Sequence, residues 1–121
     1  MCRYINAEQI IGATFIQLLI KEKSQLSFSE LFKISKDLDI ETRRNNNAVI
    51  RMSTSEIYNT VNNYGAFFCI EDDSIKLSDT GRERYNNSFD EFIDILDSYF
   101  YAGIPGDIKK TVIKTILKVG V

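Results

Sequence analysis

The side chains that could do acid–base chemistry in this chain are carboxylates and lysines, because its 121 residues include no histidine. One acidic group, Glu71-Asp72-Asp73, occupies a turn between two apolar runs, and a second has the spacing of a helix face: Asp90, Glu91, Asp94 and Asp97. Paired carboxylates can act as general acids and bases, but both groups are typical of exposed, solvated acids. The sequence also lacks a glycine-rich phosphate loop, a nucleophile motif and metal-ligand spacing. We therefore expect no enzyme activity, no cofactor and no metal site.

A second kind of chemistry, hydrogen bonding to DNA bases, is indicated by amides between residues 55 and 63. On a helix over this segment, the side opposite Ile57 and Val61 carries a polar set: Ser55, Tyr58, Asn59, Asn62 and Asn63. Asparagine can form two hydrogen bonds with an adenine edge, and such a pair discriminates between bases by about 1–3 kcal/mol. The pattern predicts a helix face that reads the major groove.

Phosphate contacts would have to come from outside this helix, because the 55–64 segment contains no lysine or arginine. The candidates are Arg43, Arg44 and Arg51, in a polar segment without helical or strand period that runs from residue 41 to 51. We predict a loop there that contacts phosphate. The alternative is a plain solvated loop, since asparagine is abundant along the whole chain.

The charge of the chain favours a protein partner over nucleic acid. The net charge is −2 and the isoelectric point is near 5.2, which argues against non-specific coating of nucleic acid but permits a local basic face. Residues 53–87 hold three basic and six acidic residues, a net charge of −3 on the half expected to meet DNA. If DNA is bound, we expect the acidic turn to stay clear of it.

The elements that position these side chains follow from apolar spacing and capping residues. Helical periodicity predicts a helix over 7–23 with Asn6 as N-cap, and one over 27–39 where Ser27 and Glu30 have capping-box spacing. Ser53 and Glu56 repeat that spacing and open a third helix through residue 64. The apolar runs 66–70 and 75–77 around the acidic turn predict a β-hairpin. Three further helices are expected, opened by Ser78, Ser88 and Asp107.

The stretch from Ser55 to Tyr85 resembles the winged helix-turn-helix superfamily of transcription regulators. In that superfamily the second wing strand commonly runs into a Leu-Ser/Thr-x-x-Gly-Arg motif, and here the sequence is Leu77-Ser78-Asp79-Thr80-Gly81-Arg82. The resemblance implies a mainly α fold with a small β-hairpin, with helix 55–64 as the recognition helix and 71–74 as the wing tip. One departure is the dozen residues between the second and third helices, where the family has a short turn. Either a helix extends into that region or the loop is an insertion.

The length of the chain fits a single domain, residues 1–121. A winged-helix core over 7–86 is followed by two additional C-terminal helices over 88–119. The leading interpretation is a cytoplasmic regulator that binds double-stranded DNA. The alternative is a winged-helix protein–protein interaction module, such as a subunit or a phage-type inhibitor, that binds no nucleic acid.

The last helix has features of an interface. Lys110, Lys114 and Lys118 stack on one face, the opposite side is apolar, and Ile113 and Leu117 broaden that apolar arc beyond what one small core needs. We expect a homodimer through residues 88–119, with another protein partner on the same helices as the alternative. No apolar run approaches the roughly 20 residues of a membrane-spanning helix, and Cys2 and Cys69 are expected to be free thiols.

Overall fold

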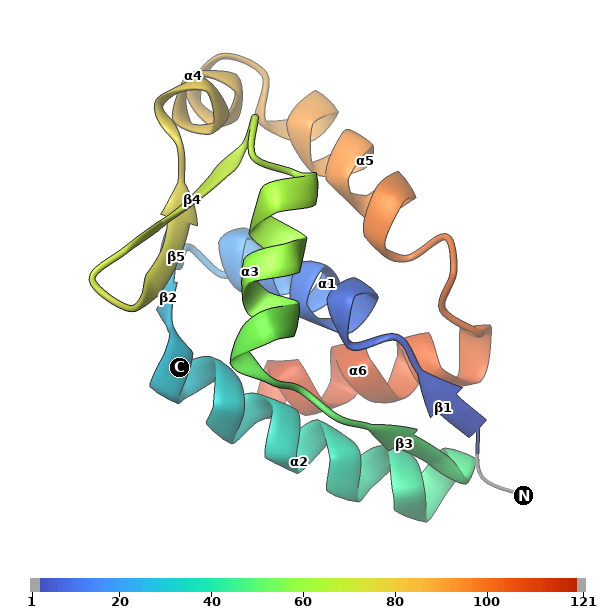
Figure 1. Ribbon diagram of the computed structural model, residues 1–121. Coiled ribbons are helices and arrows are strands. Elements are labelled where there is room, and N and C mark those ends of the chain that lie inside the picture. Colours follow the sequence, from blue (N-terminus) through green and yellow to red (C-terminus); the bar gives the residue numbers. More distant parts are fainter. Residues whose placement is uncertain (1–2, 120–121) are drawn as a thin grey trace.

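The computed structural model of the chain describes residues 3–119 and is mainly helical, with short strands (Figure 1). The elements follow in this order: β1 (Arg3–Ile5), α1 (Ala7–Ile20), β2 (Gln25–Ser27), α2 (Phe28–Asn46), β3 (Ala48–Ile50), α3 (Thr54–Asn63), β4 (Phe68–Glu71), β5 (Ser74–Leu77), α4 (Asp79–Asn87), α5 (Phe89–Phe100) and α6 (Gly106–Val119). The mainly α fold with a small hairpin, expected from the sequence, is confirmed at this level.

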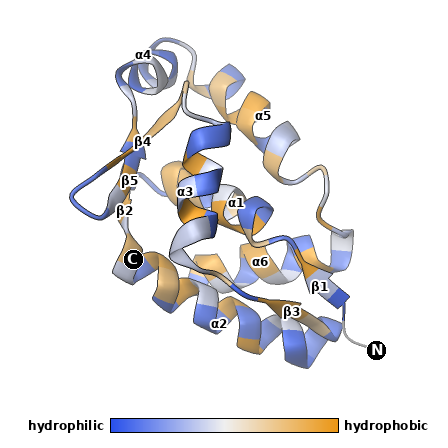
Figure 2. Ribbon diagram, viewed as in Figure 1, coloured by the Kyte–Doolittle hydropathy of each residue, from blue (hydrophilic) through white to orange (hydrophobic). Residues whose placement is uncertain are grey.

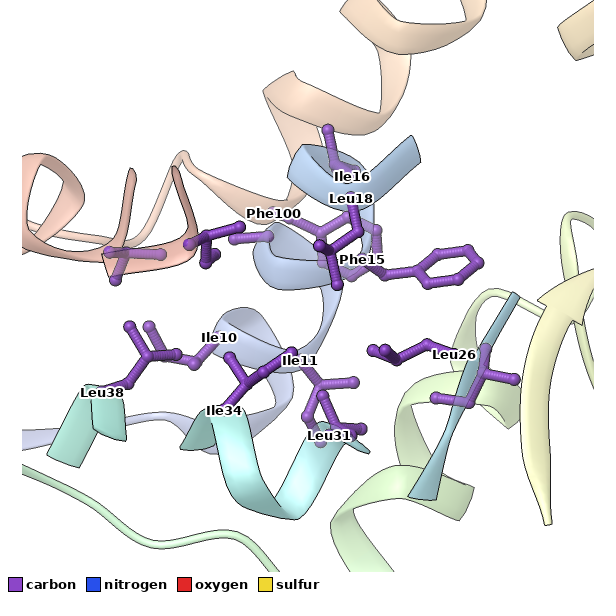
Figure 3. Packing of buried hydrophobic residues seen from close by; sticks show 14 of the residues in the cluster. Ile10, Ile11, Phe15, Ile16, Leu18, Leu26, Leu31, Ile34, Leu38 and Phe100 are labelled. Atoms are coloured by element: carbon purple, nitrogen blue, oxygen red, sulfur yellow. The ribbon is translucent and has the colours of Figure 1, made fainter. Parts of the chain in front are cut away.

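Helix α1 lies at the centre of the molecule because it is apolar on nearly every side, and such a helix is stable only when covered all round. Ten of its 14 residues are buried. Helices α3, α5 and α6 pack against it, and Figure 3 shows Ile10 and Ile11 facing the apolar stripe of α2, formed by Leu31, Ile34 and Leu38. Asn6 caps α1 as predicted, its side chain accepting a hydrogen bond from the Glu8 amide. The helix ends at Ile20, earlier than predicted, because Glu22 has a left-handed φ of 70°.

A three-stranded antiparallel sheet has the order β2-β5-β4. The predicted hairpin is present as β4 and β5, joined by Asp72 and Asp73, which both have positive φ. Two such residues form the type I′ turn that suits the twist of a hairpin. Strand β2 was not predicted from the sequence. It pairs Leu26 with Ile75 and so ties the start of α2 to the hairpin.

The prediction of a loop over residues 41–51 is wrong, because α2 continues to Asn46. Thr42 is fully buried on the core side, and the side chains of Asp39 and Arg43, one turn apart, form an ion pair with a 3.0 Å N–O distance. Asn47, with φ of 51°, ends the helix. Residues 48–50 then form β3, which pairs in parallel with β1. Of the two possibilities for this region, an extended helix and an inserted loop, the structure shows the extended helix.

The helices after β3 follow the capping signals with two exceptions. Ser53 and Glu56 form a complete capping box on α3, and Ser78 caps α4 by accepting from the Gly81 amide. Ser88 precedes α5 but makes no side-chain cap hydrogen bond. Asp107 was predicted to be the N-cap of the last helix, and this is wrong: it is the second residue of α6.

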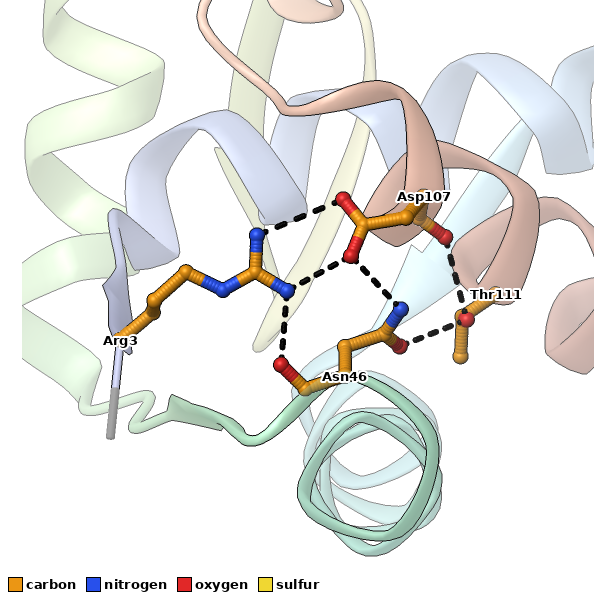
Figure 4. A network of polar contacts seen from close by, with 4 residues as sticks. All are labelled: Arg3, Asn46, Asp107 and Thr111. Atoms are coloured by element: carbon orange, nitrogen blue, oxygen red, sulfur yellow. Dashed lines mark hydrogen bonds and ion pairs between the residues drawn. The ribbon is translucent and has the colours of Figure 1, made fainter. Parts of the chain in front are cut away.

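The carboxylate of Asp107 instead joins a polar network between three segments (Figure 4). Arg3 donates to it at 2.6 Å, and the same guanidinium nitrogen donates to the backbone carbonyl of Asn46. The Asn46 amide donates to Asp107, and the Thr111 hydroxyl donates to the Asn46 side-chain oxygen at 2.7 Å. Hydrogen bonding to Arg3 lowers the pKa of Asp107 to about 2. The network fixes β1, the end of α2 and the start of α6 together.

Candidate nucleic-acid interface

Helix α3 presents the polar face that the sequence predicted. Its buried side consists of Ile57, Thr60 and Val61, which are at most 7% exposed. The five predicted base-contacting residues are all exposed: Ser55, Tyr58, Asn59, Asn62 and Asn63. Figure 2 shows hydrophilic residues along the C-terminal half of this helix. The capping box and the packing on α1 therefore hold the five side chains together on one outward face.

Two residues of this face have intramolecular contacts. The Tyr58 ring packs edge-to-face against Phe28 at the start of α2, with centroids 5.9 Å apart. The Asn63 amide donates a hydrogen bond to the Glu8 carboxylate of α1. Within residues 3–119, no hydrogen bond engages the side chains of Asn59 and Asn62. These two amides retain all their donors and acceptors for a ligand.

The three arginines predicted to contact phosphate differ in where they lie relative to α3. Arg51 directly follows β3, three residues before α3 begins, is exposed, and has no ion pair within residues 3–119. Arg43 and Arg44 lie in the last turn of α2, at the end that contacts Arg3 and α6. A straight helix rises about 1.5 Å per residue, so Arg43 lies about 22 Å along α2 from Phe28, the residue that contacts α3.

Arg43 and Arg44 are also partly neutralised. Arg43 donates to both carboxylate oxygens of Asp39, and Asp39 in turn accepts the backbone N–H of Ile50 at 2.9 Å. Arg44 pairs more loosely with Glu41, at 3.7 Å. Arg43 thus orients the carboxylate that anchors β3 to α2. Arg51 is the one of the three that the structure leaves both unpaired and adjacent to α3.

Two basic residues that the sequence reasoning did not single out lie beyond the other end of α3. Helix α4 packs on the segment after α3: the Ser78 hydroxyl donates to the Ala66 carbonyl, and Gly81 lies against the Phe67 carbonyl. Arg82 and Arg84 on α4 are exposed and have no ion pair within the described residues. The Gly81-Arg82 pair of the wing motif was the signal that could have identified this position.

The hairpin tip is acidic, as its sequence indicates. Glu71, Asp72 and Asp73 are all exposed. Lys76, the one basic residue of the two hairpin strands, pairs with Glu71 at 2.9 Å, and this hydrogen bond raises the pKa of its ammonium group. The tip therefore presents negative charge that would repel phosphate.

A groove of about 580 Å³ lies between α2 and α6, away from the α3 face. Apolar side chains of Ile34 and Ile40 line it, and its charged side chains balance: Lys23, Lys33 and Lys118 against Glu30, Asp37 and Glu41. Across residues 3–119, no three histidine, cysteine or carboxylate side chains are grouped as a metal site would require.

Comparison of the chain with models of protein families, with curated proteins and with solved structures finds no match. Over the part of the chain that the structure describes, no helix has both the length and the apolar character needed to cross a membrane.

Proposed function

We propose that this chain is a winged helix-turn-helix domain that binds double-stranded DNA as a transcription regulator, with α3 as its recognition helix. The observation that carries the proposal is the exposed polar face of α3, on which the amides of Asn59 and Asn62 have no intramolecular partner. The arrangement of elements supports it. Helices α1, α2 and α3 precede a β4–β5 hairpin, which leads into α4 through Leu77 and Ser78.

The proposed contacts divide into base reading and phosphate binding. The major groove admits an α-helix, and asparagine bonds the N6 and N7 atoms of adenine. Asn59 and Asn62, three residues apart on α3, would meet neighbouring base edges. Arg51 before the helix and Arg82 beyond it would bind phosphates and fix its orientation. This assignment replaces Arg43 and Arg44, whose guanidinium groups are paired with Asp39 and Glu41.

Fluorescence anisotropy with a labelled mixed-sequence duplex, repeated at several salt concentrations, tests the proposal. We expect a dissociation constant of about 10⁻⁴–10⁻⁶ M with a steep salt dependence. Arg51→Ala should weaken binding to all sequences and reduce the salt slope by about 1. Arg44→Ala, the matched control, should leave the slope unchanged. Absence of binding at low salt would contradict the proposal.

A second candidate, a protein–protein interaction module, is favoured by the electrostatics. The hairpin tip is acidic, its lysine is paired with Glu71, and Arg43 is paired with Asp39. The uncharged α3 face would then contact a protein surface, where exposed Tyr58 is a residue type enriched in interfaces. The same titration separates the two functions, because this module shows no salt-dependent affinity for the duplex.

A further inference from the structure

Helices α5 and α6 diverge from the 101–105 turn and both pack on α1 (Figure 1). Phe100, at the end of α5, lies against Gly12, and the buried Tyr101 hydroxyl donates to the Ala13 carbonyl. At the other end of α1, the Lys21 ammonium donates to the Leu117 carbonyl of α6 at 3.1 Å. Both helices therefore cover α1, and their outward faces, together with the exposed end of α1, are named the α5–α6 surface.

Apolar side chains remain uncovered on this surface. Leu117 on α6 is 56% exposed, and Ile20, the last residue of α1, is 46% exposed. Ile113, one turn before Leu117 on the same side of α6, is half-buried. Ile108, Val112 and Ile116 are fully buried, so the core uses one side of α6. The apolar arc is wider than the core requires, as the sequence predicted.

The two helices also carry opposite, uncompensated charges. Helix α5 has four acidic residues and no basic one: Asp90, Glu91, Asp94 and Asp97. Helix α6 has four lysines, Lys109, Lys110, Lys114 and Lys118, and its one acid, Asp107, is bound to Arg3. Within residues 3–119, none of these four acids or four lysines forms an ion pair. Lys109 instead lies over the Tyr101 ring, 4.6 Å from its centroid.

We propose that a second copy of this chain binds the α5–α6 surface, related by a two-fold axis that runs between the two helices. Such an axis places α5 of each copy over α6 of the other, so each acidic helix faces a basic one, and the symmetry makes this contact twice. The other symmetric arrangement, with α5 over α5, opposes like charges. The exposed Ile20 and Leu117 then lie inside the interface and the charged residues at its rim, as in stable dimers.

The required area is modest. A stable interface buries about 800 Å² per partner, roughly an eighth of the 6728 Å² surface of this chain. The α3 face is not part of the proposed interface, so the dimer stands independently of the DNA-binding proposal.

A charge-swap experiment tests the dimer. One variant carries Asp90→Lys and Asp94→Lys on α5, and the other carries Lys110→Glu and Lys114→Glu on α6. In sedimentation velocity at low ionic strength, where exposed charges are least screened, the wild type should be a dimer. Each variant alone should dimerise at least about tenfold more weakly, because like charges then oppose each other. An equimolar mixture of the two should form a heterodimer, because both contacts regain opposite charges.

Circular dichroism of each variant checks that the fold is retained. The control, Lys36→Glu on α2 with Arg51→Glu after β3, makes the same charge change outside the surface and should remain a dimer. A monomeric wild type overturns the proposal and points to a different partner on this surface. Variants that dimerise as strongly as the wild type, or a mixture that stays monomeric, overturn the α5–α6 arrangement.

Discussion

Replacing Gly12 by alanine tests the close contact between α1 and α5. In a helix interior this substitution ordinarily stabilises a protein by about 1 kcal/mol, because alanine is the better helix former. At position 12, however, a new Cβ would lie 1.8 Å from Cδ1 and 2.0 Å from Cε1 of Phe100. The Phe100 ring is 1% exposed and is enclosed by Tyr64 and Phe68, so it has no free space to move into.

The size of the effect follows from these two opposing terms. Overpacking a well-packed core costs about 1–3 kcal/mol, and contacts this short place Gly12→Ala at the upper end of that range. Subtracting the gain of about 1 kcal/mol in helix propensity leaves a destabilisation of about 2 kcal/mol. For a domain of this size the midpoint temperature should fall by about 8 °C.

Urea unfolding followed by circular dichroism measures the change in the free energy of unfolding. Gly106→Ala is the matched control: it also adds one methyl group within a helix, but its Cβ would meet no atom within 4 Å. It should leave stability unchanged or slightly raised. In the Gly12→Ala background, Phe100→Leu should recover part of the loss by making room for the methyl group. A Gly12→Ala variant as stable as Gly106→Ala would refute the described packing of α1 against α5.

Three further predictions concern stability. Asp107→Asn should weaken the acid dependence of unfolding, which unfolding at a series of pH values would measure. Arg3 lowers the folded pKa of Asp107 to about 2. The contribution of this carboxylate to stability is therefore full above its unfolded pKa near 4 and is lost as pH falls toward 2. Ser53→Ala removes the capping box and should cost about 1 kcal/mol in urea unfolding, whereas the exposed Ser55→Ala on the same helix should change stability by less than about 0.5 kcal/mol. Gly81→Ala should lower the thermal midpoint, because its Cβ would lie 2.3 Å from the Phe67 carbonyl oxygen, a backbone atom that cannot shift easily to make room. An unchanged midpoint would contradict that contact.

The elements that could be predicted from the sequence are those with strong local signals. The Ser53–Glu56 capping box places the start of α3 correctly, and the acidic turn between apolar runs places the hairpin. Both signals act over a few residues, where the side chain and the backbone it bonds are close in sequence. The exposed face of α3 follows, since helical periodicity fixes which side meets the core.

The strands β1, β2 and β3 could not be predicted because each has three residues, too few to display an alternating pattern. Their stability comes from partners distant in sequence, as when Leu26 pairs with Ile75. The end of α2 was missed for a related reason. Its last two turns bury little beyond Thr42 and are held by ion pairs and by the Asn46 network with Arg3 and α6. Of the three arginines predicted to contact phosphate, Arg43 and Arg44 lie on that last turn of α2, and Arg51 is the one that the proposed function keeps.

The most direct test of the proposed function is the affinity for duplex DNA of a variant altered only on the α3 face. Asn59→Asp with Asn62→Asp replaces two unengaged amides by carboxylates, and Gln25→Glu with Asn45→Asp makes the same change at two exposed positions outside α3 and α4. In the low-salt anisotropy titration we predict that the α3 variant loses binding and the control variant keeps most of the wild-type affinity. Equal affinities for the two variants would contradict the placement of α3 in the groove.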